Sequence, residues 1–321
     1  MYSGNGVSVE AGVSMDLYLL DFMRNELCPN GIWALSDVVR SVLDRQILRL
    51  PKGNVPEMEV RYPTSLAGMR AFLEVFFTRH YFQVQDSLIE YVVSQDFLDA
   101  IASGNLRILD VSSGPALASL AITDMLVSIL AYFRDSRLWR WGRVAVTYVL
   151  NDTSGVCLGT GQQMLRNYFS SGRSGGGAVI QGPAFAVQRA FPDDMSQLRR
   201  IARDSGPYDI VTFSYVVVPL SEDRGIDEVV DGLRATEGLC GDGARIVILQ
   251  DRFNVSLVRA ISGKLGVPTQ ERDLVQEVYP DRNTTETYTY SYCSCFYGSG
   301  EKCMGRRSSV MQMSPDLAVA F

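Results

Sequence analysis

A turn of small residues follows a short apolar run near the end of the first third of the chain. Within Leu106–Phe133, the apolar residues before Asp110 suit a buried strand, and a long apolar helix pattern comes after the turn. The turn itself consists of Ser112, Ser113, Gly114 and Pro115. A strand, a tight turn and a helix together place backbone N–H groups and a helix N-terminus against a ligand. We therefore predict a ligand site at this turn.

A second pair of polar residues, Asn151 and Asp152, follows the next apolar run, Val144–Leu150. A carboxylate after the second strand accepts hydrogen bonds from both hydroxyls of a ribose in dinucleotide sites. Asp152 occupies that place, while Asp110 could accept from an ammonium group of the same ligand. Taken singly, Asp110 could simply cap a strand and Asp152 could be a loop residue. Their positions at the ends of consecutive strands favour a shared site for a nucleoside.

Three further residues are candidates for catalysis. Tyr215 lies within a strongly β-branched segment, Tyr208–Val218, and is the best candidate, and Ser214 is the residue before it. His80 is the only histidine and could act as a base, although a lone histidine among aromatic residues is often a core or surface residue. Asp251 could contact a substrate or cap the following helix.

Two clusters have less specific patterns. Cysteines at 293, 295 and 303 lack the paired two-residue spacing of metal sites, so we predict free thiols and no metal. The segment Arg134–Arg143 interleaves arginines with Trp139 and Trp141 and could dock RNA or an acidic partner. The alternative, which we favour, is a solvated helix end with tryptophans packed beneath it.

Composition limits the class of protein. The 321 residues carry a net charge of −6, which does not indicate a general affinity for nucleic acid. The first residues show no basic segment followed by an apolar one, so we expect no signal peptide and a cytoplasmic location. Ala116–Phe133 approaches membrane-spanning length, but it contains Asp124 and follows a strand directly. We therefore expect a helix packed on a sheet and no membrane contact.

The pattern of elements changes near residue 105. The first third is helical over Met15–Leu48 and Ser65–Ser103, with a proline-containing loop at Leu50–Pro63. We interpret residues 1–104 as a helical cap. Alternating strands and helices then predict a parallel sheet covered on both faces. The later strands are predicted at Val144–Leu150, Ala178–Gln181, Tyr208–Val218 and Ile246–Leu249, before an antiparallel hairpin of Leu274–Tyr279 and Thr285–Tyr297.

This α/β pattern resembles the Rossmann-like fold of class I S-adenosylmethionine-dependent methyltransferases over Asn105–Tyr297. The resemblance rests on ILDVSSGPA, on Asn151–Asp152 and on YDIVTFSYVVVPL. It is similar, more narrowly, to ribosomal small-subunit methyltransferase-like proteins and to small-molecule N-methyltransferases. The resemblance implies S-adenosylmethionine as cofactor, held by the turn, by Asn151–Asp152, by Ser214 and, at the adenine, by Gln181 and Gly182.

The chain departs from the family pattern at three places. Ser112 replaces the first glycine of the turn, and no acidic residue follows the third strand. Ser214–Val217 stands where members that methylate amino groups of nucleobases carry Asn/Asp-Pro-Pro-aromatic, which argues against that reaction.

We therefore predict a methyltransferase domain at residues 105–300 and a tail at 301–321, with the cap favouring a small-molecule acceptor. One alternative is an inactive methyltransferase-like protein that acts as a scaffold, which the Ser112 replacement motivates. Another is a nicotinamide-dependent oxidoreductase, although the chain has no G-x-G-x-x-G turn.

Overall fold

The computed structural model describes residues 17–28, 35–138, 142–171, 178–251, 255–266, 272–273 and 316–320. The first third is helical, as the sequence predicts. Its elements are α1 (Leu17–Leu27), α2 (Asp37–Arg49), α3 (Glu57–Arg61), α4 (Leu66–Val92) and α5 (Gln95–Ala102). Serine side chains cap the starts of α2, α4 and α5, because each accepts a hydrogen bond from the backbone N–H three residues later.

The rest of the described chain alternates strands and helices. Its elements are β1 (Asn105–Val111), α6 (Leu117–Asp135), β2 (Val144–Asn151), α7 (Gly155–Ser170), β3 (Val179–Val187), α8 (Met195–Ser205), β4 (Tyr208–Ser214), α9 (Val217–Arg224), α10 (Ile226–Glu237), β5 (Cys240–Asp251), α11 (Val255–Leu265), β6 (Arg272–Asp273) and β7 (Asp316–Ala320). The sheet order is β3-β2-β1-β4-β5-β7-β6, and β1 to β5 are parallel. The predicted parallel α/β sheet is confirmed.

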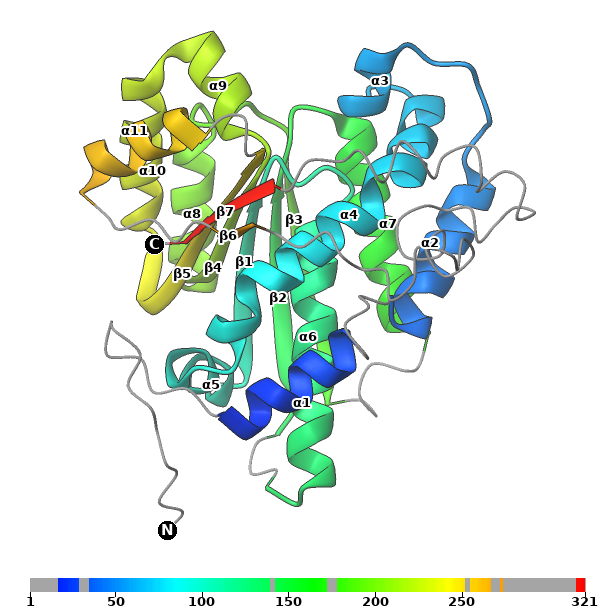
Figure 1. Cartoon of the computed structure of the whole chain (residues 1–321), viewed down its shortest axis with the longest axis vertical. Coiled ribbons are helices and arrows are strands. Elements are labelled where there is room, and N and C mark those ends of the chain that lie inside the picture. Colours follow the sequence, from blue (N-terminus) through cyan, green and yellow to red (C-terminus); the bar gives the residue numbers. More distant parts are fainter. Residues whose placement is uncertain are drawn as a thin grey trace.

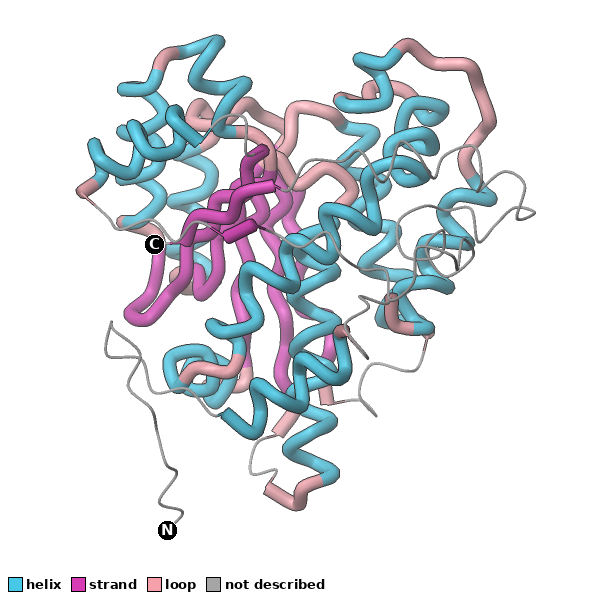
Figure 2. The backbone as a smooth tube through the Cα atoms, viewed as in Figure 1, coloured by secondary structure: helices cyan, strands magenta, loops and turns pink. Residues whose placement is uncertain are grey.

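Helices cover both faces of the sheet (Figures 1 and 2). One core joins α1, α2, α4, α6 and α7 to residues such as Ile108 of β1. The other joins α8, α10 and α11 to residues such as Leu109, the next residue of the same strand. This alternation follows from the two-residue side-chain period of a strand.

Helix α6 is long and apolar enough to cross a membrane by length and composition, but 72% of its most apolar window is buried inside the protein. It lies against the sheet and α4, as expected for a core helix.

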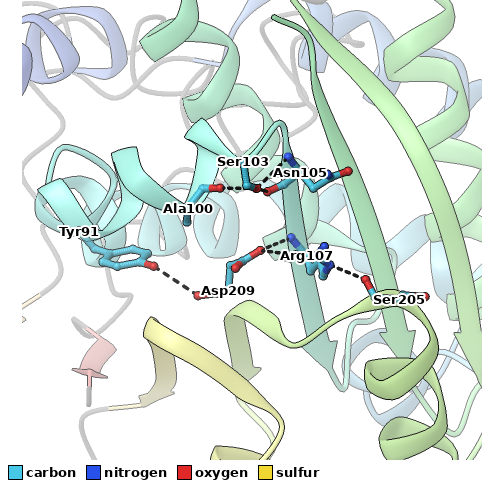
Figure 3. Close-up of polar contacts among 7 residues, drawn as sticks. All are labelled: Tyr91, Ala100, Ser103, Asn105, Arg107, Ser205 and Asp209. Carbon is cyan, nitrogen blue, oxygen red and sulfur yellow. Dashed lines mark hydrogen bonds and ion pairs between the residues drawn. The ribbon is translucent and has the colours of Figure 1, made fainter. Parts of the chain in front are cut away.

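Polar contacts tie the helices to the amino ends of β1 and β4 (Figure 3). The Tyr91 hydroxyl of α4 donates to the Asp209 carbonyl over 3.3 Å, and the Asp209 carboxylate accepts from the Arg107 N–H over 2.7 Å. The Arg107 guanidinium in turn donates to the Ser205 carbonyl at the end of α8. Burial raises the pKa of Asp209, while Arg107 opposes the shift. The amino edge is thus closed by the protein's own contacts.

Several sequence predictions differ from the structure. The loop Leu50–Pro63 contains a short helix, α3, which begins after Pro56 because proline suits the start of a helix. The strand predicted to reach Val218 ends at Ser214, since Tyr215 has a φ of 60° and Val217 begins α9.

The predicted hairpin Leu274–Tyr297 lies outside the described residues and is not confirmed. Instead, β7 pairs with β5 and β6 in antiparallel orientation, and it comes from the segment predicted to be a tail. Part of that segment therefore belongs to the sheet.

Candidate functional site

The turn after β1 has a left-handed backbone at alternate residues. The φ angles are 53° at Ser112, 51° at Gly114 and 59° at Ala116. Residues with a Cβ rarely adopt this conformation, and glycine adopts it without cost. Ser112 therefore has a backbone conformation that favours glycine, although it carries a side chain. Ala116 was not predicted as a site residue, because alanine gives no sequence signal for a positive φ.

Asp152 contacts this turn directly. Its carboxylate accepts hydrogen bonds from the Gly114 N–H over 2.9 Å and from the Ser154 N–H over 2.8 Å. Burial raises the pKa of Asp152, and these N–H donors oppose the shift. The structure thus brings together the glycine turn of β1 and the carboxylate that follows β2.

Asp110, predicted to accept from a ligand, is bound by groups of the protein itself. It is fully buried, and its carboxylate accepts from the Ser119 N–H over 3.1 Å, from the Ser119 hydroxyl over 2.9 Å and from the Thr212 hydroxyl over 2.9 Å. Burial raises the pKa of Asp110 to about 7, against the effect of these donors. Asp110 therefore joins β1 to α6 and β4.

Asn151 joins two strands through its side-chain N–H group, whereas its side-chain oxygen has no hydrogen-bond partner. It is fully buried, and its side-chain N–H group donates to the Val187 carbonyl over 3.2 Å and to the Arg189 carbonyl over 2.8 Å. These bonds join β2 to the end of β3. Its side-chain oxygen is buried without a hydrogen-bond partner, as is the hydroxyl of Ser214. Two buried polar atoms at the carboxyl edge of the sheet thus lack a partner in the protein.

The structure places the predicted adenine contacts, Gln181 and Gly182, within the third strand and not after it. The third strand continues to Val187, six residues beyond its predicted end, so both residues lie inside β3. Gln181 pairs with Val146 in the first half of β2, away from the carboxyl edge. A Cβ on Gly182 would come within 2.9 Å of the Val146 carbonyl, so the glycine serves strand packing.

Two candidate catalytic residues meet although they are far apart in the sequence. The His80 ring of α4 stacks on the Tyr215 ring with centroids 4.0 Å apart and planes at 17°. The Tyr215 hydroxyl donates to the side-chain oxygen of Gln83, one turn further along α4. Asp251 is the last residue of β5, and its side chain lies outside the described residues.

Residues of the cap lie close to the turn. The Phe72 ring comes within 3.9 Å of the position that a Cβ on Gly114 would take. The Pro63 carbonyl, just before α4, accepts from the Ser154 hydroxyl over 2.7 Å. Neither residue was predicted as a site residue, because an aromatic residue and a proline in a helical region are usually read as core and loop.

Gly161 of α7 permits the turn to pack closely. A Cβ there would lie 2.8 Å from the Ala116 Cβ and 2.9 Å from its backbone nitrogen. We expect Gly161→Ala to lower the free energy of unfolding by about 1–3 kcal/mol, because overpacking forces backbone shifts.

Urea unfolding provides the measurement. Gly159→Ala is the matched control, because a Cβ at Gly159 meets no atom within 4 Å and alanine favours a helix by about 0.5–1 kcal/mol. Equal effects of the two substitutions would contradict the packing role of Gly161.

The other candidate clusters lie elsewhere. Among the described residues no group of three or more His, Cys, Asp or Glu could hold a metal ion, and Cys28, Cys157 and Cys240 are free thiols. The cysteines at 293, 295 and 303 lie outside the described residues. In the basic segment, Arg134 ends α6 and Arg143 precedes β2, so both lie near the amino edge, opposite the turn.

Neither a family model nor a curated protein matches the chain. Several solved structures are similar to it. A putative class I S-adenosylmethionine-dependent methyltransferase from Listeria monocytogenes is 10% identical, over 92% of this chain and 87% of that one, with a TM-score of 0.35. A putative O-methyltransferase from Klebsiella pneumoniae is 10% identical, over 95% and 96%, with a TM-score of 0.33.

A methyltransferase from Geobacter sulfurreducens, in complex with S-adenosylhomocysteine, is 12% identical, over 70% of this chain and 90% of that one, with a TM-score of 0.31. Because the identities and TM-scores are low, we base the proposed function on the site and not on these similarities.

Proposed function

We propose that the chain is an S-adenosylmethionine-dependent methyltransferase that acts on a small molecule. The observation that carries this proposal is the 2.9 Å hydrogen bond between the Gly114 N–H and the Asp152 carboxylate. It joins a left-handed turn to an acidic side chain across the tips of neighbouring parallel strands. In open α/β sheets this edge is where nucleoside ligands bind.

The residues present fit the cofactor. Gly114 has no side chain and is half-buried, so a ligand can approach the backbone of the turn. Asp152 supplies an acceptor for ribose hydroxyls, and the buried Asn151 oxygen and Ser214 hydroxyl lack partners in the protein. When bound, S-adenosylmethionine supplies an electrophilic methyl group carried on a sulfonium. Methyl transfer depends mainly on positioning and exclusion of water, so an obligatory base is not required.

The cap supports a small acceptor. Phe72 approaches Gly114, and the Pro63 carbonyl binds the start of α7. His80 and Tyr215 place a further pair of rings beside the tip of β4. These groups cover part of the edge of the sheet and leave less room for a polymer than an open edge would.

Calorimetry with S-adenosylhomocysteine, S-adenosylmethionine and NAD tests the proposal. We expect binding of both sulfur compounds and a preference for them over NAD. A preference for NAD would favour the oxidoreductase alternative. Absence of binding to all three would overturn the proposal and favour a scaffold. Methyl transfer to an acceptor, followed by mass spectrometry, separates an active enzyme from a binding protein.

We expect Asp152→Ala to weaken S-adenosylhomocysteine binding by about 1–3 kcal/mol, because a hydrogen-bonding carboxylate is lost from the site. Titration calorimetry measures the change. Thr153→Ala is the control, since Thr153 is exposed and adjacent. Unchanged affinity in a folded Asp152 variant would remove this residue from the site.

A further inference from the structure

Aromatic side chains form a continuous row along one side of α4 and onto the tip of β4. We call Phe72, Phe76, His80 and Tyr215 the aromatic row. The ring centroids of Phe72 and Phe76 lie 5.6 Å apart, those of Phe76 and His80 lie 5.6 Å apart with planes at 26°, and those of Phe72 and His80 lie 6.1 Å apart with planes at 70°. The three α4 rings therefore contact one another, and His80 also stacks on Tyr215. The three α4 residues are four positions apart, so they share one side of the helix.

The row spans the carboxyl edge between β1 and β4. Phe72 lies at the β1 end, beside Gly114. Tyr215 lies at the β4 end, where its N–H donates to the Leu249 carbonyl over 2.8 Å and its hydroxyl donates to Gln83. A φ of 60° at a tyrosine is uncommon, and such strain often occurs at functional sites. The backbone therefore holds this ring toward α4 in an unfavourable conformation.

Phe72 belongs to the apolar core, and Phe76 and Tyr215 pack against it at its margin. The adjacent positions on α4, Phe77 and Tyr81, are fully buried and fill the core against α6. By contrast, Phe76, His80 and Tyr215 are only half-buried, although large aromatic rings gain most when fully removed from water. The helix thus carries one aromatic row in the core and a second, partly exposed row at the proposed cofactor edge.

We propose that the methyl acceptor is a flat, conjugated ring compound that packs against the exposed part of the aromatic row. This inference rests on the proposed function, because it identifies the class of acceptor for the same site. Aromatic faces prefer offset or edge-on contact with another ring. An aliphatic acceptor would leave this geometry unused.

Binding of 2-naphthol and of its saturated analogue, decahydro-2-naphthol, tests the inference. The two compounds share a carbon skeleton and one hydroxyl, but only 2-naphthol has an aromatic face. Calorimetry with the full chain, alone and saturated with S-adenosylhomocysteine, should show at least about threefold tighter binding of 2-naphthol. We expect Phe76→Leu to weaken 2-naphthol binding about three- to tenfold and to leave the binding of decahydro-2-naphthol nearly unchanged.

Val75→Ala is the matched control, since Val75 is the preceding residue on α4 and is exposed. It should leave both affinities unchanged. Equal binding of the two compounds, or loss of 2-naphthol binding in Val75→Ala as large as in Phe76→Leu, would overturn the inference. Failure of S-adenosylhomocysteine to bind would overturn the proposed function instead, and the comparison of the two naphthol compounds would still decide whether the row binds aromatic rings.

Discussion

Asp110→Asn is expected to make stability less dependent on pH. In the native protein, the free energy of unfolding should fall by up to about 4 kcal/mol between about pH 4 and pH 7, and the variant should not show this fall. Burial raises the pKa of Asp110 to about 7 in the folded protein, whereas the unfolded chain has an ordinary carboxyl pKa. Between these values the folded state binds the proton and the unfolded state does not. The free energy of unfolding therefore falls as the pH rises through this interval.

Asparagine suits this position. Its oxygen can accept from the Ser119 N–H and hydroxyl, and its amide group can donate to the Thr212 hydroxyl. Urea unfolding of both proteins across this pH range measures the difference, and the shared contribution of the other carboxyls cancels. The variant should match the native protein near pH 4 and exceed its stability at pH 8. A difference that does not depend on pH would contradict the titration of Asp110.

Asp124→Ala is expected to lower the free energy of unfolding by about 3 kcal/mol or more, because three hydroxyls lose their acceptor. The buried carboxylate of Asp124 accepts from the Tyr81 hydroxyl over 2.7 Å, from the Tyr168 hydroxyl over 2.7 Å and from the Ser36 hydroxyl over 2.9 Å. Tyr81 lies in α4 and Tyr168 lies in α7, and Ser36 is the N-cap residue of α2. Burial raises the pKa of Asp124, and all three donors oppose the shift.

Tyr168→Phe provides a graded comparison. It removes one donor and leaves the Asp124 carboxylate with two, so we expect a loss of about 1–2 kcal/mol. Thermal and urea unfolding of both variants measure the effects. An effect of Asp124→Ala no larger than that of Tyr168→Phe would show that the network adds little beyond a single hydrogen bond.

Some features of the fold and site follow from local sequence. The apolar runs of β1, β2 and β4 and the small turn before α6 predict a parallel sheet with its turn at one edge, and the structure confirms that sheet. Asp152 and Gly114 could be predicted to meet because the ends of neighbouring parallel strands share an edge. The starts of α2 and α4 are also marked locally, because each follows a serine and serine is a common N-cap residue.

Other features depend on contacts that spacing alone does not reveal. The orientation of Asp110 is set by Ser119 and Thr212, so its residue type could not distinguish a ligand-facing carboxylate from a buried one. The length of β3 was missed because Gly182 and Pro183 follow Gln181, and glycine and proline are uncommon inside strands. The stack of His80 on Tyr215 joins residues that are 135 positions apart in the sequence and required the tertiary structure.

The shared core of the cap and the sheet has a consequence for engineering. Residues from α1, α2 and α4 belong to the same apolar cluster as Ile108, Val146 and Ile210 of the sheet. Shortened forms that start near β1 would keep α6 and α7 but would expose the apolar side chains that pack against α1, α2 and α4, and would be prone to aggregate. Attempts to change the ligand that this protein binds should therefore use point substitutions in α4. Replacement of the whole N-terminal segment would disrupt the shared core.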